Sequence, residues 1–198
     1  MSKNTFRVHP IMIPFFLFFY LSGEIAMYAL VFGSLLVHEL GHLMAAICMG
    51  SKIQSCTILP YGGEIKIEQF SKLSKIVQVC IILGGPFGTI LLLLFGILVD
   101  FPQANIFIMI QFLILGLNLL PIFPLDGGRI VHSIFPKRYE ELIGFSGVIC
   151  VILVAISFYY FPSGLPFTLI FLFLTFQNLS YWRFRKYKLA FDWITKSA

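Results

Sequence analysis

Three ionisable residues stand close together in the sequence V-H-E-L-G-H-L-M, namely His38, Glu39 and His42. On a helix, two histidines four residues apart lie one turn from each other and point about 40° apart. Two imidazoles in this arrangement can bind one divalent metal ion, and zinc is the ion we expect. The Glu39 side chain points about 60° to the side of His42. Its carboxylate can therefore reach a water on the ion and act as a general base.

A single histidine on an apolar helix is more often a hydrogen-bonded core residue than a metal ligand. Here, however, three ionisable groups lie within five residues of an apolar segment. Each of them costs several kcal/mol to place in a membrane without a partner, and a shared metal ion gives all three a use. The pattern therefore favours a metal site.

A catalytic zinc ion usually has three protein ligands and one position open to water. The strongest candidate for the third ligand is Asp126, in N-L-L-P-I-F-P-L-D-G-G-R. Pro121 and Pro124 stop the helix while the sequence stays apolar, so we expect this stretch to be covered by protein and to pack against the helix that carries the histidines. The alternative is that Asp126 only caps the short helix that begins near Gly128. The ligand role is favoured because a dication with Asp126 and Glu39 sums to zero charge.

These residues together predict hydrolysis of an amide bond. The ion would lower the pKa of its water toward neutrality, and Glu39 would pass a proton from that water to the leaving amine. The abundant amide in a membrane is the peptide bond, so the substrate would be a transmembrane protein that unwinds before attack. The main alternative is a transporter or metal-handling membrane protein, in which the same His and Asp residues form a transit site. That alternative leaves Glu39 without a specific task.

The composition of the 198 residues excludes a soluble globular protein. Only 12% of the residues are charged and 59% are hydrophobic, against roughly 25% charged in an ordinary soluble domain. This balance also argues against a disordered chain and against binding to nucleic acid. The four cysteines show no C-x-x-C pair and are interpreted as small apolar residues. We therefore expect an integral membrane protein that contacts the lipid bilayer.

Six apolar runs are candidates to cross the bilayer, which takes about 20 helical residues. They cover residues 8–21, 25–49, 76–99, 104–120, 142–160 and 165–182. If the N-terminus is cytoplasmic, six crossings place all 14 Lys and Arg on the cytoplasmic side, as the positive-inside rule requires. We therefore expect an all-α polytopic membrane protein with six transmembrane helices and both termini cytoplasmic. Residues 1–198 are expected to form a single domain.

The segment after the second run has a different pattern. Charged residues alternate with isoleucine over residues 64–68, directly after a Gly-Gly pair. This alternation predicts a short membrane-associated strand or hairpin. An unwound substrate could add to it as a further strand through main-chain hydrogen bonds. A plain cytoplasmic hairpin is the equally weighted alternative. The candidate substrate-binding residues here are Pro60, Tyr61, Gly62 and Gly63.

These motifs resemble the site-2 protease family of intramembrane zinc metalloproteases, and within it the stage IV sporulation protein FB type, without the C-terminal CBS domain of that branch. The resemblance extends over nearly the whole chain. It is carried by V-H-P (8–10), H-E-L-G-H (38–42), L-P-Y-G-G (59–63), G-G-P (84–86) and N-L-L-P-I-F-P-L-D-G-G (118–128). The resemblance implies that His38, His42 and Asp126 bind zinc. It also implies that Glu39 is the catalytic base and that Asn118 helps to hold the substrate or the oxyanion.

The resemblance further implies a membrane-tethered protein substrate, cut to release a cytoplasmic fragment, at the membrane of a bacterial cell. In the sporulation branch this substrate is a pro-sigma factor, and a regulatory membrane partner would control the cut. Thr89 stands where many relatives carry the Asn of G-P-x-x-N. Arg129 either orients Asp126 or a substrate carbonyl, or faces the cytoplasmic headgroups, and we favour the headgroups. A third alternative is an inactive relative that escorts transmembrane helices, but the four intact site residues argue against it.

Overall fold

The computed structural model describes residues 5–59, 62–160 and 165–197. The chain is mostly helical and divides into two compact units, Met1–Leu119 and Leu120–Ala198. The first unit contains the predicted histidine cluster, and the second contains Asp126. Pro60 and Tyr61, two of the predicted substrate-binding residues, lie outside the described residues.

The first unit begins with a strand, β1 (Thr5–Val8), followed by the helices α1 (Met12–Leu21) and α2 (Ile25–Cys48). The prediction that a membrane span starts at residue 8 was therefore wrong, because Val8 belongs to β1. Helix α1 has 10 residues, about half of the length that a bilayer crossing needs. Helix α2 has 24 residues and is long enough to cross.

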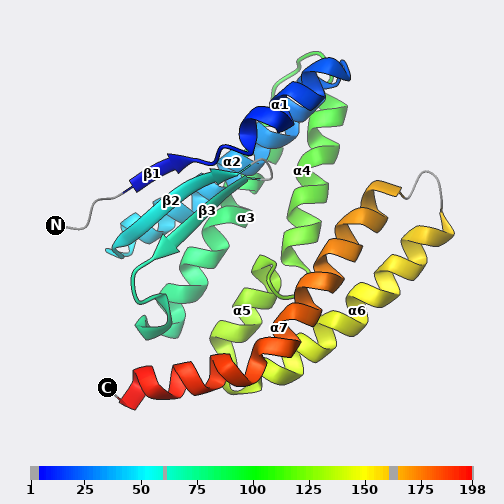
Figure 1. The fold of residues 1–198 in the computed structure, drawn as a ribbon. Helices are drawn as coiled ribbons and strands as arrows, with labels where there is room; N and C mark the ends of the chain where they lie inside the picture. The colour runs from blue at the N-terminus through cyan, green and yellow to red at the C-terminus, as the bar shows by residue number, and fades with distance from the viewer. Residues whose placement is uncertain (1–4, 60–61, 161–164, 198) are drawn as a thin grey trace. The chain divides into compact units, whose positions relative to one another are not determined.

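A small sheet follows α2 and lies beside it (Figure 1). Strands β2 (Ile53–Leu59) and β3 (Gly62–Ile67) pair antiparallel, which confirms the predicted hairpin. Strand β1 pairs parallel to β2, so the order in the sheet is β1-β2-β3 and β3 lies at one edge. Strand β1 was not predicted, because its partner is some fifty residues away along the chain.

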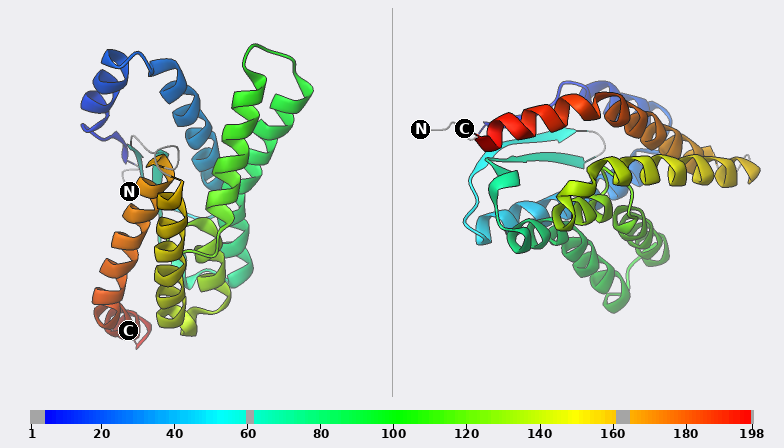
Figure 2. Two further views of the ribbon diagram at one scale, coloured as in Figure 1. Left: turned by 90° about the vertical axis from the view of Figure 1, so that its right-hand side faces the viewer. Right: turned by 90° about the horizontal axis from the view of Figure 1, so that it is seen from below.

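After a short 3-10 helix η1 (Phe70–Lys72), the chain forms α3 (Lys75–Leu98) and α4 (Ala104–Leu119). These two helices lie side by side in Figure 2. Helix α3 also packs closely on α2, through glycines on both helices. A Cβ on Gly84 would lie 2.7 Å from the Cβ of Ala45 and would collide with the Gly41 carbonyl. Small residues of this kind let helix backbones approach closely in membranes.

The second unit contains α5 (Asp126–Ile134), a 3-10 helix η2 (Pro136–Arg138), α6 (Tyr139–Tyr159) and α7 (Leu165–Ser197). The irregular stretch before α5 is held by the two long helices. The backbone N–H of Phe123 donates to the Ser146 hydroxyl at 3.0 Å, and the Asn178 amide donates to the Phe123 carbonyl at 2.6 Å. The expectation that protein covers this stretch is therefore confirmed, whereas its packing against the helix that carries the histidines stays a prediction.

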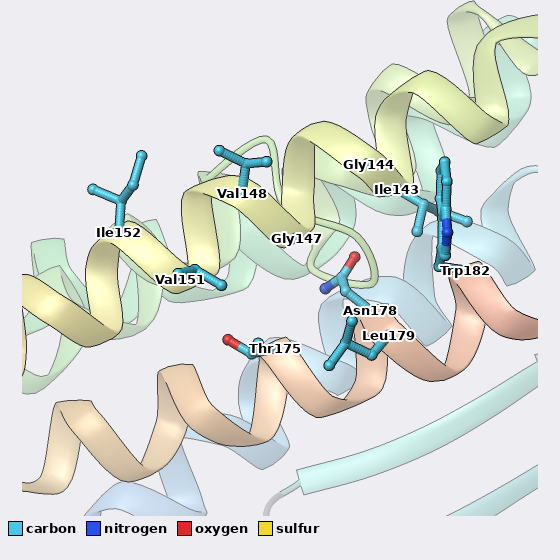
Figure 3. A pocket seen from close by; sticks show the side chains of 10 residues that line it. All are labelled: Ile143, Gly144, Gly147, Val148, Val151, Ile152, Thr175, Asn178, Leu179 and Trp182. Atoms are coloured by element: carbon cyan, nitrogen blue, oxygen red, sulfur yellow. The ribbon is translucent and has the colours of Figure 1, made fainter.

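Helices α6 and α7 lie side by side and leave an apolar groove of about 400 Å³ between them (Figure 3). Gly144 and Gly147 on α6 and Asn178 on α7 line this groove, and the Trp182 ring lies 3.5 Å from where a Cβ on Gly144 would be. Five aliphatic side chains, the two glycines and Trp182 make most of the lining apolar, as expected of a surface that faces lipid, while Thr175 and Asn178 are its polar members.

Three helices in the described part of the chain are long and apolar enough to cross a membrane: Ile25–Cys48, Lys75–Leu98 and Pro136–Tyr159. Two shorter apolar helices are Met12–Leu21 and Ala104–Leu119. Many large hydrophobic side chains along these helices are exposed. This arrangement confirms a polytopic, mostly helical membrane protein with a small sheet, whereas the count of six crossings stays a prediction.

Candidate metal centre

The predicted cluster forms on α2. The ligand atoms of His38, Glu39 and His42 all lie within 4.8 Å of one another. The two imidazole rings have centroids 4.9 Å apart and stand nearly perpendicular, at 83°. Both histidines are buried, with 2% and 6% of their surface exposed. The one-turn spacing thus brings two buried imidazoles together with a half-buried carboxylate, as the sequence pattern predicts.

Helix α3 contacts Nδ1 of both imidazole rings. Nδ1 of His38 lies 2.8 Å from the Thr89 hydroxyl oxygen. Nδ1 of His42 lies 3.0 Å from the Ile81 carbonyl and 3.1 Å from the backbone N–H of Gly85. Metal-binding histidines commonly bind the ion through one ring nitrogen while the other bonds to protein. The contacts from α3 are of this second kind and point to Nε2 as the ligand atom of each ring.

Gly85 leaves open space beside the two Nε2 atoms. A Cβ at this position would lie 2.6 Å from Nε2 of His38 and would also collide with Nε2 of His42. Zinc binds imidazole nitrogen at about 2.0–2.1 Å. The volume that the missing side chain leaves free is therefore close to ligand distance from both rings, so the residues of this site fit a zinc ion.

Strand β3 passes over the Glu39 side chain. A Cβ on Gly63 would lie 3.3 Å from both Cβ and Cγ of Glu39, and one on Gly62 would lie 3.7 Å from Cγ. Gly62 has φ +128°, a backbone conformation that favours glycine. Two of the four predicted substrate-binding residues therefore lie directly against the predicted base.

The Glu39 carboxylate affects the pKa of Cys56 in strand β2. Burial raises the pKa of the Cys56 thiol, and the nearby Glu39 carboxylate raises it further. Cys56 therefore keeps its proton at higher pH than an ordinary cysteine. The pKa of Cys56 can therefore report the ionisation of Glu39 without an assay of catalytic activity.

Asp126 is the first residue of α5 in the second unit, and 4% of it is exposed. The N-cap position of α5 is Leu125, so the alternative that Asp126 caps this helix is wrong. An oxygen of the Asp126 carboxylate lies 3.4 Å from Nη1 of Arg129, as the alternative in which this arginine orients Asp126 expects, and the headgroup role that we favoured stays a prediction. The role of Asp126 as the third metal ligand stays a prediction.

Asn118 lies near the end of α4 in the first unit and is half-buried. Its side-chain amide donates to the Ile114 carbonyl one turn earlier, at 3.0 Å. This bond uses one of the two N–H donors of the amide, and the predicted role in holding substrate or oxyanion stays a prediction.

The sequence analysis did not assign Gly85 and Thr89 to the site. Both residues were visible, Gly85 in the G-G-P segment and Thr89 as a departure from G-P-x-x-N. Their spacing of four residues places them on one face of a helix, which was a usable signal. Which helix that face meets depends on tertiary packing, and the pattern alone does not carry that information.

Comparisons with known proteins find similarity over the part of the chain that carries this cluster. Residues 26–105, which include α2, the sheet hairpin and the part of α3 that contacts the histidines, match the model of Peptidase family M50. Zinc metalloprotease MJ0392 of Methanocaldococcus jannaschii is 34% identical over 125 residues, covering 59% of this chain and 36% of that protein. Stage IV sporulation protein FB of Bacillus subtilis is 32% identical over 109 residues, covering 52% and 38%.

A solved structure is similar as well. The Site-2 Protease from Methanocaldococcus jannaschii superposes with a TM-score of 0.63 at 26% identity, covering 88% of this chain and 89% of that one. The chain spans less than half the length of the two curated relatives described above.

Proposed function

We propose that this chain is a zinc endopeptidase, which cuts a membrane-tethered protein within or near its transmembrane segment. The premise is that the chain belongs to the site-2 protease family within peptidase family M50. The observation that carries the proposal is the cluster of His38, Glu39 and His42, with both imidazoles buried and the carboxylate half-buried, beside the open space at Gly85. A hydrolase that uses a metal needs ligands and a base side by side.

His38, His42 and Asp126 would hold the ion, which supplies a Lewis acid and lowers the pKa of the attacking water. Glu39 accepts a proton from that water and then donates it to the leaving amine. Burial of both histidines strengthens the electrostatic interactions at the site, because the surroundings are less polarisable than water. Asn118 would stabilise the substrate or its oxyanion.

Strand β3 supports a way to bind the substrate. In the described part of the chain β3 pairs only with β2, so its other edge can accept a further strand. A transmembrane segment must unwind before its carbonyl can be attacked, and adding it to β3 would hold it extended through main-chain hydrogen bonds. Gly62 and Gly63 then bring that extended chain next to Glu39. Pro60 and Tyr61 belong to the same proposed binding segment.

The cellular setting follows from the same proposal. We place the protein in a bacterial cell membrane with six crossings and both termini cytoplasmic, consistent with the distribution of its Lys and Arg residues. Cleavage would release a cytoplasmic fragment. As the resemblance to the sporulation branch implies, a pro-sigma factor is the proposed substrate and a membrane protein the proposed regulator.

The test is cleavage of a single-span substrate after both proteins are reconstituted in lipid vesicles. Because Glu39→Gln removes the proton acceptor, we expect at least about a 100-fold loss of cleavage rate, with zinc still bound. Persistent cleavage by this variant would refute the assigned base. The same vesicles distinguish the metal-handling alternative, which predicts zinc flux across the vesicle wall with or without a carboxylate at position 39.

A further inference from the structure

Thr89 on α3 has a buried hydroxyl that connects the histidine cluster to the backbone of α3. The residue has 0% of its surface exposed. Its Oγ1 lies 2.8 Å from Nδ1 of His38 and donates to the Gly85 carbonyl at 3.3 Å. A hydroxyl has one proton and two lone pairs. When the hydroxyl gives its proton to the Gly85 carbonyl, its oxygen can accept a hydrogen bond from His38, and Nδ1 of that ring then carries the proton.

The position of this proton decides what His38 can bind. A neutral imidazole carries one proton, so a proton on Nδ1 leaves the lone pair on Nε2. Nε2 is the atom beside the open space at Gly85. We propose that Thr89 is a positioning residue that holds His38 in the tautomer and orientation in which Nε2 faces the metal ion. This inference rests on the proposed function, because it assigns a partner to one ligand of the same ion.

The two histidines differ in what holds them. Nδ1 of His42 meets backbone groups of α3, the Ile81 carbonyl and the Gly85 N–H. The corresponding partner of His38 is a side chain, so a single substitution can remove it without moving the helix. Thr89→Val does this with little change of shape, and Thr89→Ser keeps the hydroxyl.

The experiment compares the zinc affinity of the full chain with that of these variants, purified in detergent and titrated against a competing chelator. Outer partners of metal-binding histidines typically contribute about 10–100-fold to metal affinity. We expect Thr89→Val to weaken zinc binding by that factor and Thr89→Ser to restore most of it. Thr168→Val is the matched control, since Thr168 is also buried and donates to the Ser157 hydroxyl at 3.0 Å in the other unit. It should leave zinc affinity unchanged.

A second readout does not involve the ion. Histidine labelled with ¹⁵N reports which ring nitrogen is protonated, and an assigned His38 signal from the metal-free native chain should show the proton on Nδ1. A proton on Nε2 would overturn the proposal, even if Thr89→Val failed to fold. Native zinc affinity in a folded Thr89→Val variant would overturn it as well.

His38→Ala separates this inference from the proposed function. If His38→Ala binds zinc as tightly as the native chain, the metal centre itself is wrong. If His38→Ala loses zinc while Thr89→Val keeps it, the metal centre stands and the role of Thr89 is wrong.

Discussion

Gly85→Ala tests the metal centre by filling the space in which the ion would lie. The new Cβ would stand 2.6 Å from Nε2 of His38 and would also collide with Nε2 of His42. Non-bonded carbon atoms are most stable at about 3.5–4.0 Å from their neighbours, so at least one ring must move by about 1 Å or the helices must part. Metal sites hold their ligand distances to about 0.2 Å. A displacement of that size therefore removes the binding geometry.

We expect Gly85→Ala to weaken zinc binding by more than about 100-fold, which corresponds to about 2.7 kcal/mol. Helix propensity acts in the opposite direction, because alanine stabilises a helix interior by about 0.5–1 kcal/mol relative to glycine. A loss of zinc therefore cannot be attributed to a weaker helix. Gly33→Ala is the matched control, since Gly33 lies in α2 and a Cβ there would meet nothing within 4 Å.

The assay is zinc content after dialysis against a weak chelator, together with a competition titration. Gly33→Ala should match the native chain in both measurements. If Gly85→Ala keeps native zinc affinity, the space beside the two Nε2 atoms is not the metal position, and the argument from this glycine fails.

Two further predictions concern other parts of the chain. Because the Glu39 carboxylate raises the pKa of the Cys56 thiol, Glu39→Gln should lower that pKa and speed alkylation of Cys56 at about pH 8. Peptide mass spectrometry follows the alkylation, with exposed Cys48 as the internal reference. An unchanged rate would contradict the proximity of Glu39 to Cys56. Asn178→Leu removes the donor to the Phe123 carbonyl and should destabilise the fold by about 1–3 kcal/mol. The expected result is a lower midpoint of thermal unfolding. An unchanged midpoint would show that this bond does not hold the irregular stretch before α5.

Much of the metal centre could be predicted from local patterns. The spacing of His38 and His42 fixes their relative direction on any helix, so a pairing of the two rings needs no knowledge of the rest of the fold. Alternation of charged residues and isoleucine in residues 64–68 predicted a strand for the same reason, since side chains alternate along an extended chain. Both predictions depend only on periods of regular secondary structure.

Features that depend on contacts between distant segments could not be predicted in this way. Strand β1 pairs with β2 across some fifty residues, and nothing local distinguishes it from the start of an apolar helix. The contributions of Gly85 and Thr89 follow from the register of α2 against α3, which close packing at Gly41 and Gly84 determines. The sequence shows both glycines, but it does not show that Gly41 on α2 lies against Gly84 on α3. Asp126 was correctly expected beside an irregular loop covered by protein, although its place in α5 was not.

The most direct measurement is a structure of the zinc-loaded chain with the ion located by its anomalous scattering. The account predicts one zinc beside the Cα of Gly85, bound by Nε2 of His38 and Nε2 of His42 and by the Asp126 carboxylate, with Glu39 nearby but not bound. An ion held elsewhere, or a zinc at this position without Asp126 among its ligands, would contradict it.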